Sequence, residues 1–168
     1  DPYEIDVALE KHGLLFHQNG VKLKESERHQ HADSFLLTLR AEGDEIGWEC
    51  RGTSKMLDFG KIGHYNSLDF FSPVEVRQDG GIILRKGSFY ILSTDECVLV
   101  PPELAAELRA IDPRFGEFRS HLAGFIEAGW GFGKKGDGRG RPITLEVVAH
   151  ETMRVFHRQT IARIRFEK

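Results

Sequence analysis

The chain has 168 residues, of which 40% are apolar and 29% are charged. This length suffices for one hydrophobic core, and the apolar content is too high for a disordered protein. Its 23 basic and 26 acidic residues give a formal charge of −3, so no overall positive charge is present to bind nucleic acid or an anionic membrane. No apolar run approaches the roughly 18 residues of a membrane-spanning helix. We expect a single cytoplasmic domain over residues 1–168, with no nucleic acid and no membrane as partner.

The first half of the chain predicts short strands. Residues 1–28 have weak signals and are interpreted as an N-terminal arm packed on the remainder. Apolar runs bounded by Gly, Asp, Pro and Ser then predict strands at 34–39, 81–84, 88–92 and 97–100.

One helix is predicted next, and strands follow it. Residues 101–111, PPELAAELRAI, begin with Pro, have Glu103 in the first turn and end near Arg109, as a short helix would. Further strands are predicted at 119–126, 143–149, 153–156 and 160–166. This pattern predicts a mainly β fold, a sandwich or a barrel with one short helix.

The sequence gives no support for a zinc site or a disulfide. Cys50 and Cys97 are far apart and form no CxxC pattern, so both are expected to be reduced and structural. The eight His residues are dispersed, and neither HExxH nor the zinc-deaminase pattern occurs. We therefore expect no zinc.

A glycine-rich tract precedes the strand at 143–149. Residues 131–136, GFGKKG, fit GxGxxG, but that dinucleotide-binding fingerprint needs a following helix, and a strand follows here. Ala128 and Lys135 also break the P-loop pattern. We interpret the tract as a long, mobile hairpin loop that steers an anionic substrate without fixing it. Its cations are Lys134, Lys135, Arg139 and Arg141.

Glu146 is the one acid inside the predicted strand at 143–149. It shares a strand face with Thr144 and Val148. A carboxylate in such a place lies either at a wet rim or in a desolvated site, and desolvation raises a carboxyl pKa toward the range of a general acid/base. Both alternatives stay open.

From Ser88 onward the chain resembles the dCTP deaminases, relatives of the trimeric dUTPases. The resemblance lies in FYILSTDECVLVPPELAAEL, DPRFGEFRSHLAGFIEAGWG, PITLEV and QTIARIRFE, and HADSFLLTLR is similar to an earlier family strand. In that family a phrase of the type AG-x-I-D-P-G-(Phe/Trp) leads into I-T-L-E. The stretch GEFRSHLAGF is most similar to the C-terminal half of the longer, two-domain dCTP deaminases.

The resemblance implies a fold and an activity. The fold is a dUTPase-like distorted β-barrel that assembles as a trimer, or as a dimer of fused double barrels, with active sites between barrels. The activity is hydrolysis of the 4-amino group of dCTP to give dUTP and ammonia, without zinc and with Mg²⁺ bound only through the triphosphate. The catalytic Glu of the family is the one in I-T-L-E, which is Glu146 here.

The resemblance also implies a substrate site around Glu146. The AG-x-I-D-P-G segment wraps the base and deoxyribose, and the cations before it are candidates to clamp phosphate. The implied residues are Arg114, Arg119 and His121, then Ala123, Gly124, Phe125, Ile126, Glu127 and Trp130, and finally Thr144 and Leu145.

The chain departs from the family pattern at five positions. Ala110 replaces the first Ser of S-S-x-G-R-L-G, Glu127 and Ala128 replace Asp and Pro of I-D-P-G, and Leu36 and Thr38 replace Asp and Arg of the earlier strand. These losses are explained if the chain is half of a fused protein whose other half supplies Ser-x-x-x-Arg. Two alternatives stay open, namely a dUTPase-like pyrophosphatase that uses Glu127 and a non-catalytic barrel that completes a nucleotide-binding assembly.

Overall fold

The computed structural model describes residues 2–43, 46–53, 55–111 and 124–168. Its helices are α1 (Pro2–Lys11) and the 3₁₀ turns η1 (Glu25–Glu27) and η2 (Ser67–Asp69). Its strands are β1 (Leu15–Phe16), β2 (Gln30–His31), β3 (Ser34–Thr38), β4 (Gly47–Cys50), β5 (Phe71–Pro73), β6 (Gly81–Leu84), β7 (Phe89–Val98), β8 (Ala105–Ala110), β9 (Phe125–Ile126), β10 (Arg141–Val148), β11 (Met153–Phe156) and β12 (Thr160–Glu167). The predicted mainly β class is confirmed.

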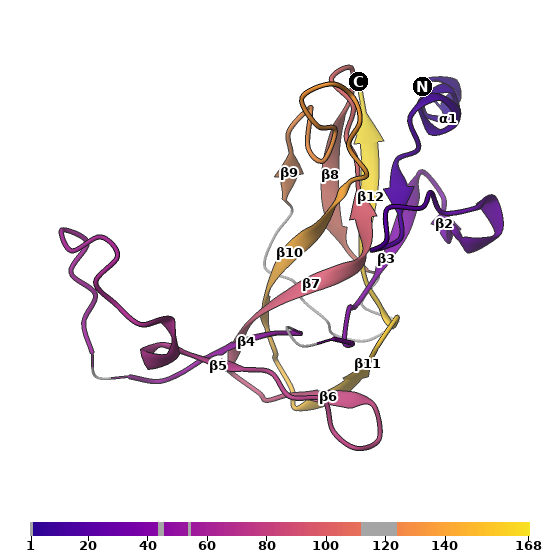
Figure 1. Cartoon of the computed structure of the whole chain (residues 1–168). Coiled ribbons are helices and arrows are strands. Elements are labelled where there is room, and N and C mark those ends of the chain that lie inside the picture. Colours follow the sequence, from indigo (N-terminus) through magenta and orange to yellow (C-terminus); the bar gives the residue numbers. More distant parts are fainter. Residues whose placement is uncertain (1, 44–45, 54, 112–123) are drawn as a thin grey trace.

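Antiparallel sheets form a distorted barrel (Figure 1). One sheet has the order β1-β7-β4-β5, with β10 also paired to β7, and a second has the order β2-β3-β12-β8-β9. Strands β6 and β11 form a separate pair. The long strand β7 joins two predicted strands, 88–92 and 97–100, into one element, and it places Glu146 of β10 opposite Ile91.

The core fills the space between the sheets with alternate residues of each strand. Leu37 of β3, Leu92 of β7, Leu145 of β10 and Ile164 of β12 are all essentially inaccessible to solvent. Alternation of this kind is what a strand with one buried face produces. The predictions at 81–84, 153–156 and 160–166 are therefore confirmed with nearly the same bounds.

The predicted helix at 101–111 is wrong. Residues Ala105–Ala110 form β8, which pairs with β12 on one side and β9 on the other. Leu104 and Leu108 are both buried, and a spacing of four residues fits one helical turn and two strand repeats equally well. A strand forms here because β12 and β9 each provide an edge with which it can pair. The tendency to form a strand depends on tertiary context more strongly than the tendency to form a helix does.

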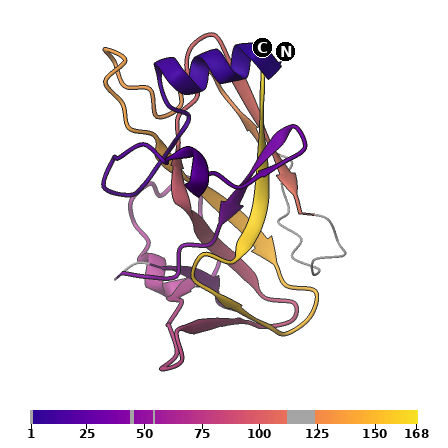
Figure 2. The ribbon, with the colours of Figure 1, turned by 90° about the vertical axis from the view of Figure 1, so that its right-hand side faces the viewer.

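The N-terminal segment contributes to the barrel core. Leu14, Leu15 and Phe16 are almost fully buried, and β1 pairs with β7. Helix α1 lies beside the barrel at the end where both termini meet (Figure 2), and Lys168 Nζ donates to Glu4 Oε1 at 2.6 Å. No helix in the described part of the chain is long and apolar enough to cross a membrane.

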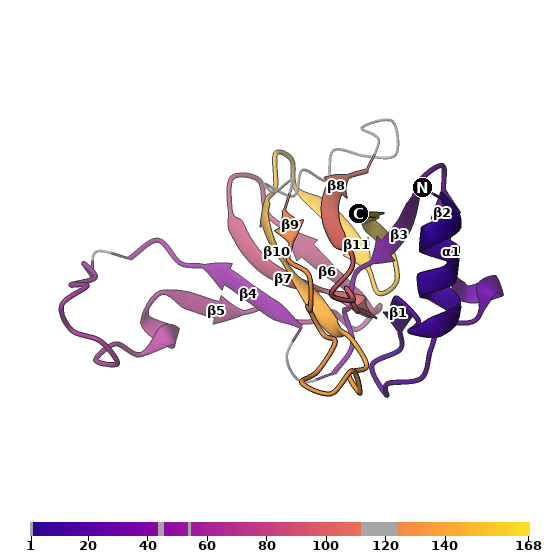
Figure 3. The same ribbon diagram turned by 90° about the horizontal axis from the view of Figure 1, so that it is seen from above.

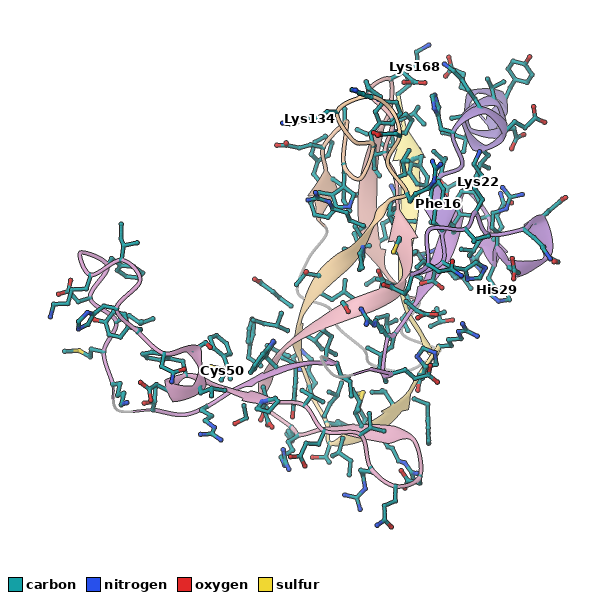
Figure 4. All side chains as sticks on the ribbon, viewed as in Figure 1. Phe16, Lys22, His29, Cys50, Lys134 and Lys168 are labelled. Atoms are coloured by element: carbon teal, nitrogen blue, oxygen red, sulfur yellow. The ribbon has the colours of Figure 1, made fainter. Side chains whose placement is uncertain are left out.

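Residues 51–70, here called the arm, project from the barrel between β4 and β5 (Figure 3). Residue 54 lies outside the description. Cys50 is at the base of the arm (Figure 4) and is exposed, whereas Cys97 is buried, and neither forms a disulfide. The expected structural role therefore fits Cys97 alone.

Candidate active site

A hollow of about 350 Å³ lies where β8, β9 and β10 come together. It is called the Glu146 hollow here. Its lining residues are Leu108, Gly124, Phe125, Ile126, Glu127, Trp130, Ile143, Thr144, Leu145 and Glu146. The volume is within the range of small-molecule sites.

Strand β10 places Glu146 at the rim of this hollow. Leu145 and Val147 are buried in the core, whereas Thr144 and Glu146 are exposed on the opposite face. Of the two alternatives left open by the sequence, the wet rim is therefore correct for the described chain. Desolvation of this carboxylate would need a covering group from elsewhere.

A buried hydroxyl fixes the start of this strand. Thr94 of β7 is inaccessible to solvent, and its Oγ1 accepts the N–H of Ile143 at 2.9 Å. The same hydroxyl donates to the carbonyl of Glu96 at 2.7 Å. The contact lies at the register shift between Pro142 and Thr144, so Thr94 pairs an N–H that the irregular ladder would leave without its usual partner.

Backbone groups and two large apolar side chains line the Glu146 hollow together with Glu146. The N–H of Leu108 donates to the carbonyl of Gly124 at 2.7 Å, which attaches the start of β9 to β8. Phe125 is 72% exposed and Trp130 is 38% exposed. Exposed aromatic rings beside backbone polar groups suit a flat, partly polar ligand such as a nucleobase with its sugar.

The structure brings most of the implied site residues together. Gly124, Phe125, Ile126, Glu127, Trp130, Thr144 and Leu145 line the same hollow as Glu146. Arg114, Arg119, His121 and Ala123 lie outside the described residues. Sequence reasoning missed Leu108 and Ile143, and the strand alternation of β8 would have indicated Leu108 had that segment not been assigned to a helix.

The glycine tract is a close-packed turn, and the prediction that it closes a hairpin is wrong. Strands β9 and β10 do not pair with each other, because β9 pairs with β8 and β10 with β7. The N–H of Val100 donates to the carbonyl of Trp130 at 2.8 Å, and the N–H of Gly138 donates to the carbonyl of Phe132 at 2.7 Å. A Cβ on Gly138 would lie 2.0 Å from the carbonyl oxygen of Gly131. The glycines are thus needed for close backbone approach.

This turn encloses a second hollow of about 670 Å³, called the basic hollow. Lys134, Arg139 and Arg141 line it, and Glu127 is its one acid. None of these three cations forms an ion pair within the described ranges. Glu127 and Trp130 line both hollows, so the two are neighbours. The lining residues are Glu127, Ala128, Gly129, Trp130, Gly131, Gly133, Lys134, Gly138, Arg139, Gly140 and Arg141.

No His, Cys, Asp or Glu side chains gather in threes or more as metal ligands in the part of the chain that the structure describes. The donors that line the two hollows are mostly backbone groups and cations. Hard divalent cations prefer several carboxylate, carbonyl or phosphate oxygens.

Comparison with known proteins identifies the family. The model for the 2'-deoxycytidine 5'-triphosphate deaminase (DCD) C-terminal domain matches residues 10–168. Among solved structures, the crystal structure of 2'-deoxycytidine 5'-triphosphate deaminase from Agrobacterium tumefaciens matches with a TM-score of 0.76 and 29% identity. That match covers 99% of this chain and 48% of the other, so this chain spans about half the length of that relative. A search of curated proteins found no match. The chain belongs to the 2'-deoxycytidine 5'-triphosphate deaminase family and corresponds to its C-terminal domain.

Proposed function

We propose that the protein containing this chain hydrolyses dCTP to dUTP and ammonia, with Glu146 as the proton shuttle. The observation that carries the proposal is that the Glu146 carboxylate lies at the rim of a hollow walled by the backbone of residues 124–127 and by Trp130. Backbone N–H and C=O groups distinguish the edges of a nucleobase without any charged side chain.

The reaction needs a group that takes and returns protons. Glu146 takes a proton from water as the water oxygen bonds to C4 of cytosine, and it delivers that proton to the ring nitrogen N3. It then moves the remaining hydroxyl proton to the amino group, the C4–N bond breaks, and ammonia leaves. One carboxylate performs both transfers, since it alternates between base and acid.

The basic hollow supports an anionic substrate. Lys134, Arg139 and Arg141 surround a space that adjoins the Glu146 hollow through Trp130. A nucleoside in the Glu146 hollow would direct its 5' phosphates toward one of its open sides, and unpaired cations attract them. The proposed Mg²⁺ belongs to the substrate, bound by phosphate oxygens and water.

Further barrels are proposed as partners. Glu146 is exposed in this chain alone, and a desolvated carboxylate is the better proton shuttle near neutral pH. A neighbouring barrel that covers the rim would provide that desolvation, in a trimer or in a dimer of fused double barrels. The proposed localisation is the cytoplasm, with neither nucleic acid nor a membrane as partner.

The test is the Glu146→Gln variant of the full-length protein. Gln keeps the size and a carbonyl oxygen but cannot accept the proton from water. We expect ammonia release from dCTP to fall by about two to four orders of magnitude, while the Kd for dCTP measured by calorimetry changes by less than about threefold. Glu151→Gln, at an exposed acid that lines neither hollow, is the matched control. A Glu146→Gln enzyme with near-normal turnover would contradict the proposal.

A second candidate function is nucleotide pyrophosphatase activity. Glu127 lines both hollows, as Trp130 does, and it is the single acid lining the basic hollow. A carboxylate beside bound phosphate suits activation of water for attack on phosphorus. Product analysis separates the candidates, because a pyrophosphatase releases pyrophosphate and depends on Glu127, whereas a deaminase releases ammonia and depends on Glu146.

A further inference from the structure

The residues that line the Glu146 hollow come from two sheets. Leu108 of β8 and Phe125 of β9 are in the sheet that also contains β3 and β12. Thr144 and Glu146 are on β10, which in the described chain pairs with β7 alone. The separation between the Glu146 carboxylate and residues 124–127 therefore depends on how the two sheets are joined.

The ladder between β10 and β7 is interrupted next to this hollow. Its register shifts between Pro142 and Thr144. Ile143, the residue between them, lies opposite three residues of β7. Bulges of this kind redirect nearby side chains and are common beside active sites. A bond that fixes Ile143 therefore fixes the start of the segment that leads to Glu146.

The Thr94 hydroxyl provides that bond. Its Oγ1 accepts the N–H of Ile143 at 2.9 Å and donates to the carbonyl of Glu96 at 2.7 Å, so it bonds both strands at the bulge. Thr94 is inaccessible to solvent, and Ile143 is 5% exposed. Loss of the hydroxyl would therefore leave a buried N–H without its partner.

Thr94 is also attached to the second sheet. Its backbone forms a bridge with Leu39, the residue that follows β3. The N–H of Arg40 donates to the carbonyl of Ser93 at 3.0 Å. Strand β3 pairs with β12, and β12 pairs with β8. A continuous series of pairings thus runs from β8 through Thr94 to the N–H of Ile143.

We propose that Thr94 is a positioning residue for deamination, whose hydroxyl holds the β10 segment that carries Glu146 at a fixed separation from residues 124–127. The proposal rests on the proposed function, because Thr94 is buried, does not line the hollow and acts through Glu146. A displacement of about 1 Å in a reacting group can lower a rate about a hundredfold. Loss of the Thr94 bond should therefore lower the rate of the chemical step.

The test compares Thr94→Val with Thr94→Ser in the full-length protein. Val has the shape of Thr without the hydroxyl, whereas Ser keeps the hydroxyl and lacks the methyl group. We expect kcat for ammonia release from dCTP to fall at least about tenfold in Thr94→Val and to stay within about threefold of the wild type in Thr94→Ser. The Kd for dCTP measured by calorimetry should change by less than about threefold in both. Unfolding curves identify a temperature at which each variant is folded.

Amide hydrogen exchange at Ile143 tests the bond without an activity assay. Exchange should be slow in the wild type and in Thr94→Ser, and at least about tenfold faster in Thr94→Val. The wild-type measurement is informative even if Thr94→Val does not fold. Rapid exchange at Ile143 in the wild type would show that Thr94 does not hold this N–H, and the proposal would be wrong.

Thr38→Val is the matched control. Thr38 is also buried, and its hydroxyl donates to Glu96 Oε1 at 2.8 Å, a bond that joins β3 to β7 and does not involve β10. This variant should lower stability as Thr94→Val does and leave kcat within about threefold of the wild type. An equal loss of kcat in Thr38→Val would show that any loosening of the barrel lowers turnover, which would overturn the proposal.

A double-mutant cycle with Glu146→Gln separates this proposal from the proposed function. If Thr94 acts through Glu146, Thr94→Val should lower the residual rate of the Glu146→Gln enzyme by less than about twofold. A further loss of about tenfold in the double variant contradicts the positioning role. A slow Glu146→Gln enzyme together with normal turnover in Thr94→Val overturns the positioning role and leaves the proposed function standing. Near-normal turnover in Glu146→Gln overturns both.

Discussion

The carboxylate of Glu96 accepts two hydrogen bonds from Thr38, one from the backbone N–H at 2.7 Å and one from the hydroxyl at 2.8 Å. These bonds join β7 to β3 and so tie one sheet to the other. Burial nevertheless raises the pKa of Glu96 above its ordinary value of 4.5, and the nearby charge of Asp95 acts in the same direction. The two bonds from Thr38 oppose this shift without cancelling it.

This relationship predicts a pH-dependent stability. A carboxyl with a raised folded-state pKa binds its proton more tightly when folded, so its contribution is fully present below about pH 4.5 and is lost as pH rises through the folded pKa. Glu96→Gln cannot ionise, and we expect the unfolding free energy of the wild type relative to this variant to fall as pH rises above 4.5 and then level off. Urea unfolding between pH 4 and 8 measures it.

The control for this experiment is Glu151→Gln, an exposed acid in the turn before β11. Its difference in unfolding free energy from the wild type should stay nearly constant with pH. A constant difference for Glu96→Gln as well would show that the folded protein does not hold the Glu96 proton more tightly than the unfolded chain does.

The packing of the glycine turn predicts a selective steric effect. Alanine at Gly138 would place Cβ 2.0 Å from one carbonyl oxygen and 2.4 Å from another backbone atom, so the backbone must move. Gly138→Ala should lower the unfolding free energy by about 1–3 kcal/mol. Gly52→Ala is the control, since a Cβ at Gly52 meets nothing within 4 Å, and it should change stability by less than about 0.5 kcal/mol. Thermal or urea unfolding measures both, and equal effects would contradict the close packing.

The fold was predictable where the residue pattern has one meaning. Alternation in β12 places Ile164 and Phe166 in the core, and no other element satisfies that pattern. It was not predictable at β8, because leucines four apart fit a helix and a strand alike. The strand forms there because β12 and β9 offer their edges, and those partners lie far away in the sequence.

The candidate site was predictable in its residues and less so in its surroundings. The family phrase around Glu127 and the carboxylate at Glu146 do share one hollow. The sequence could not show that Glu146 is exposed, since which strand face meets solvent depends on the other sheet. It also could not show that Trp130, at the start of the glycine turn, bonds to Val100. This contact across some 30 residues packs the turn against the segment that follows β7.

The position of Trp130 predicts a role in substrate binding. Its side chain is partly exposed between the two hollows, and its backbone, not its ring, makes the hydrogen bonds that hold the turn. Trp130→Ala should therefore raise the KM for dCTP at least tenfold and leave the unfolding free energy within about 1 kcal/mol. Phe156→Ala, a comparably exposed aromatic on β11, is the control. A large loss of stability with an unchanged KM would mean that Trp130 serves packing alone.

The cations of the basic hollow are predicted to affect substrate binding and to leave the chemical step nearly unchanged. Lys134 and Arg139 lie on the glycine turn and Arg141 begins β10, and none of the three lines the Glu146 hollow. Replacing these three by Gln should raise the KM for dCTP about tenfold and leave kcat within a few-fold. Lys135→Gln is the control, because Lys135 is exposed and does not line the hollow.

Two further measurements extend this test, namely the dependence of KM on salt and the effect of replacing Arg114 or Arg119 on kcat/KM. Charges on an open surface are screened, so the triple variant should also lose most of the increase of KM that the wild type shows between low and high salt. Arg114→Ala or Arg119→Ala stays predicted to lower kcat/KM by about 1.5–3 kcal/mol of transition-state stabilisation, since a guanidinium fork holds phosphate in place during the reaction. Steady-state deamination assays at two salt concentrations compare all three variants. If kcat collapses in the triple variant and the two arginine variants are unaffected, the phosphates are positioned by the glycine turn and the upstream segment has no part in holding them.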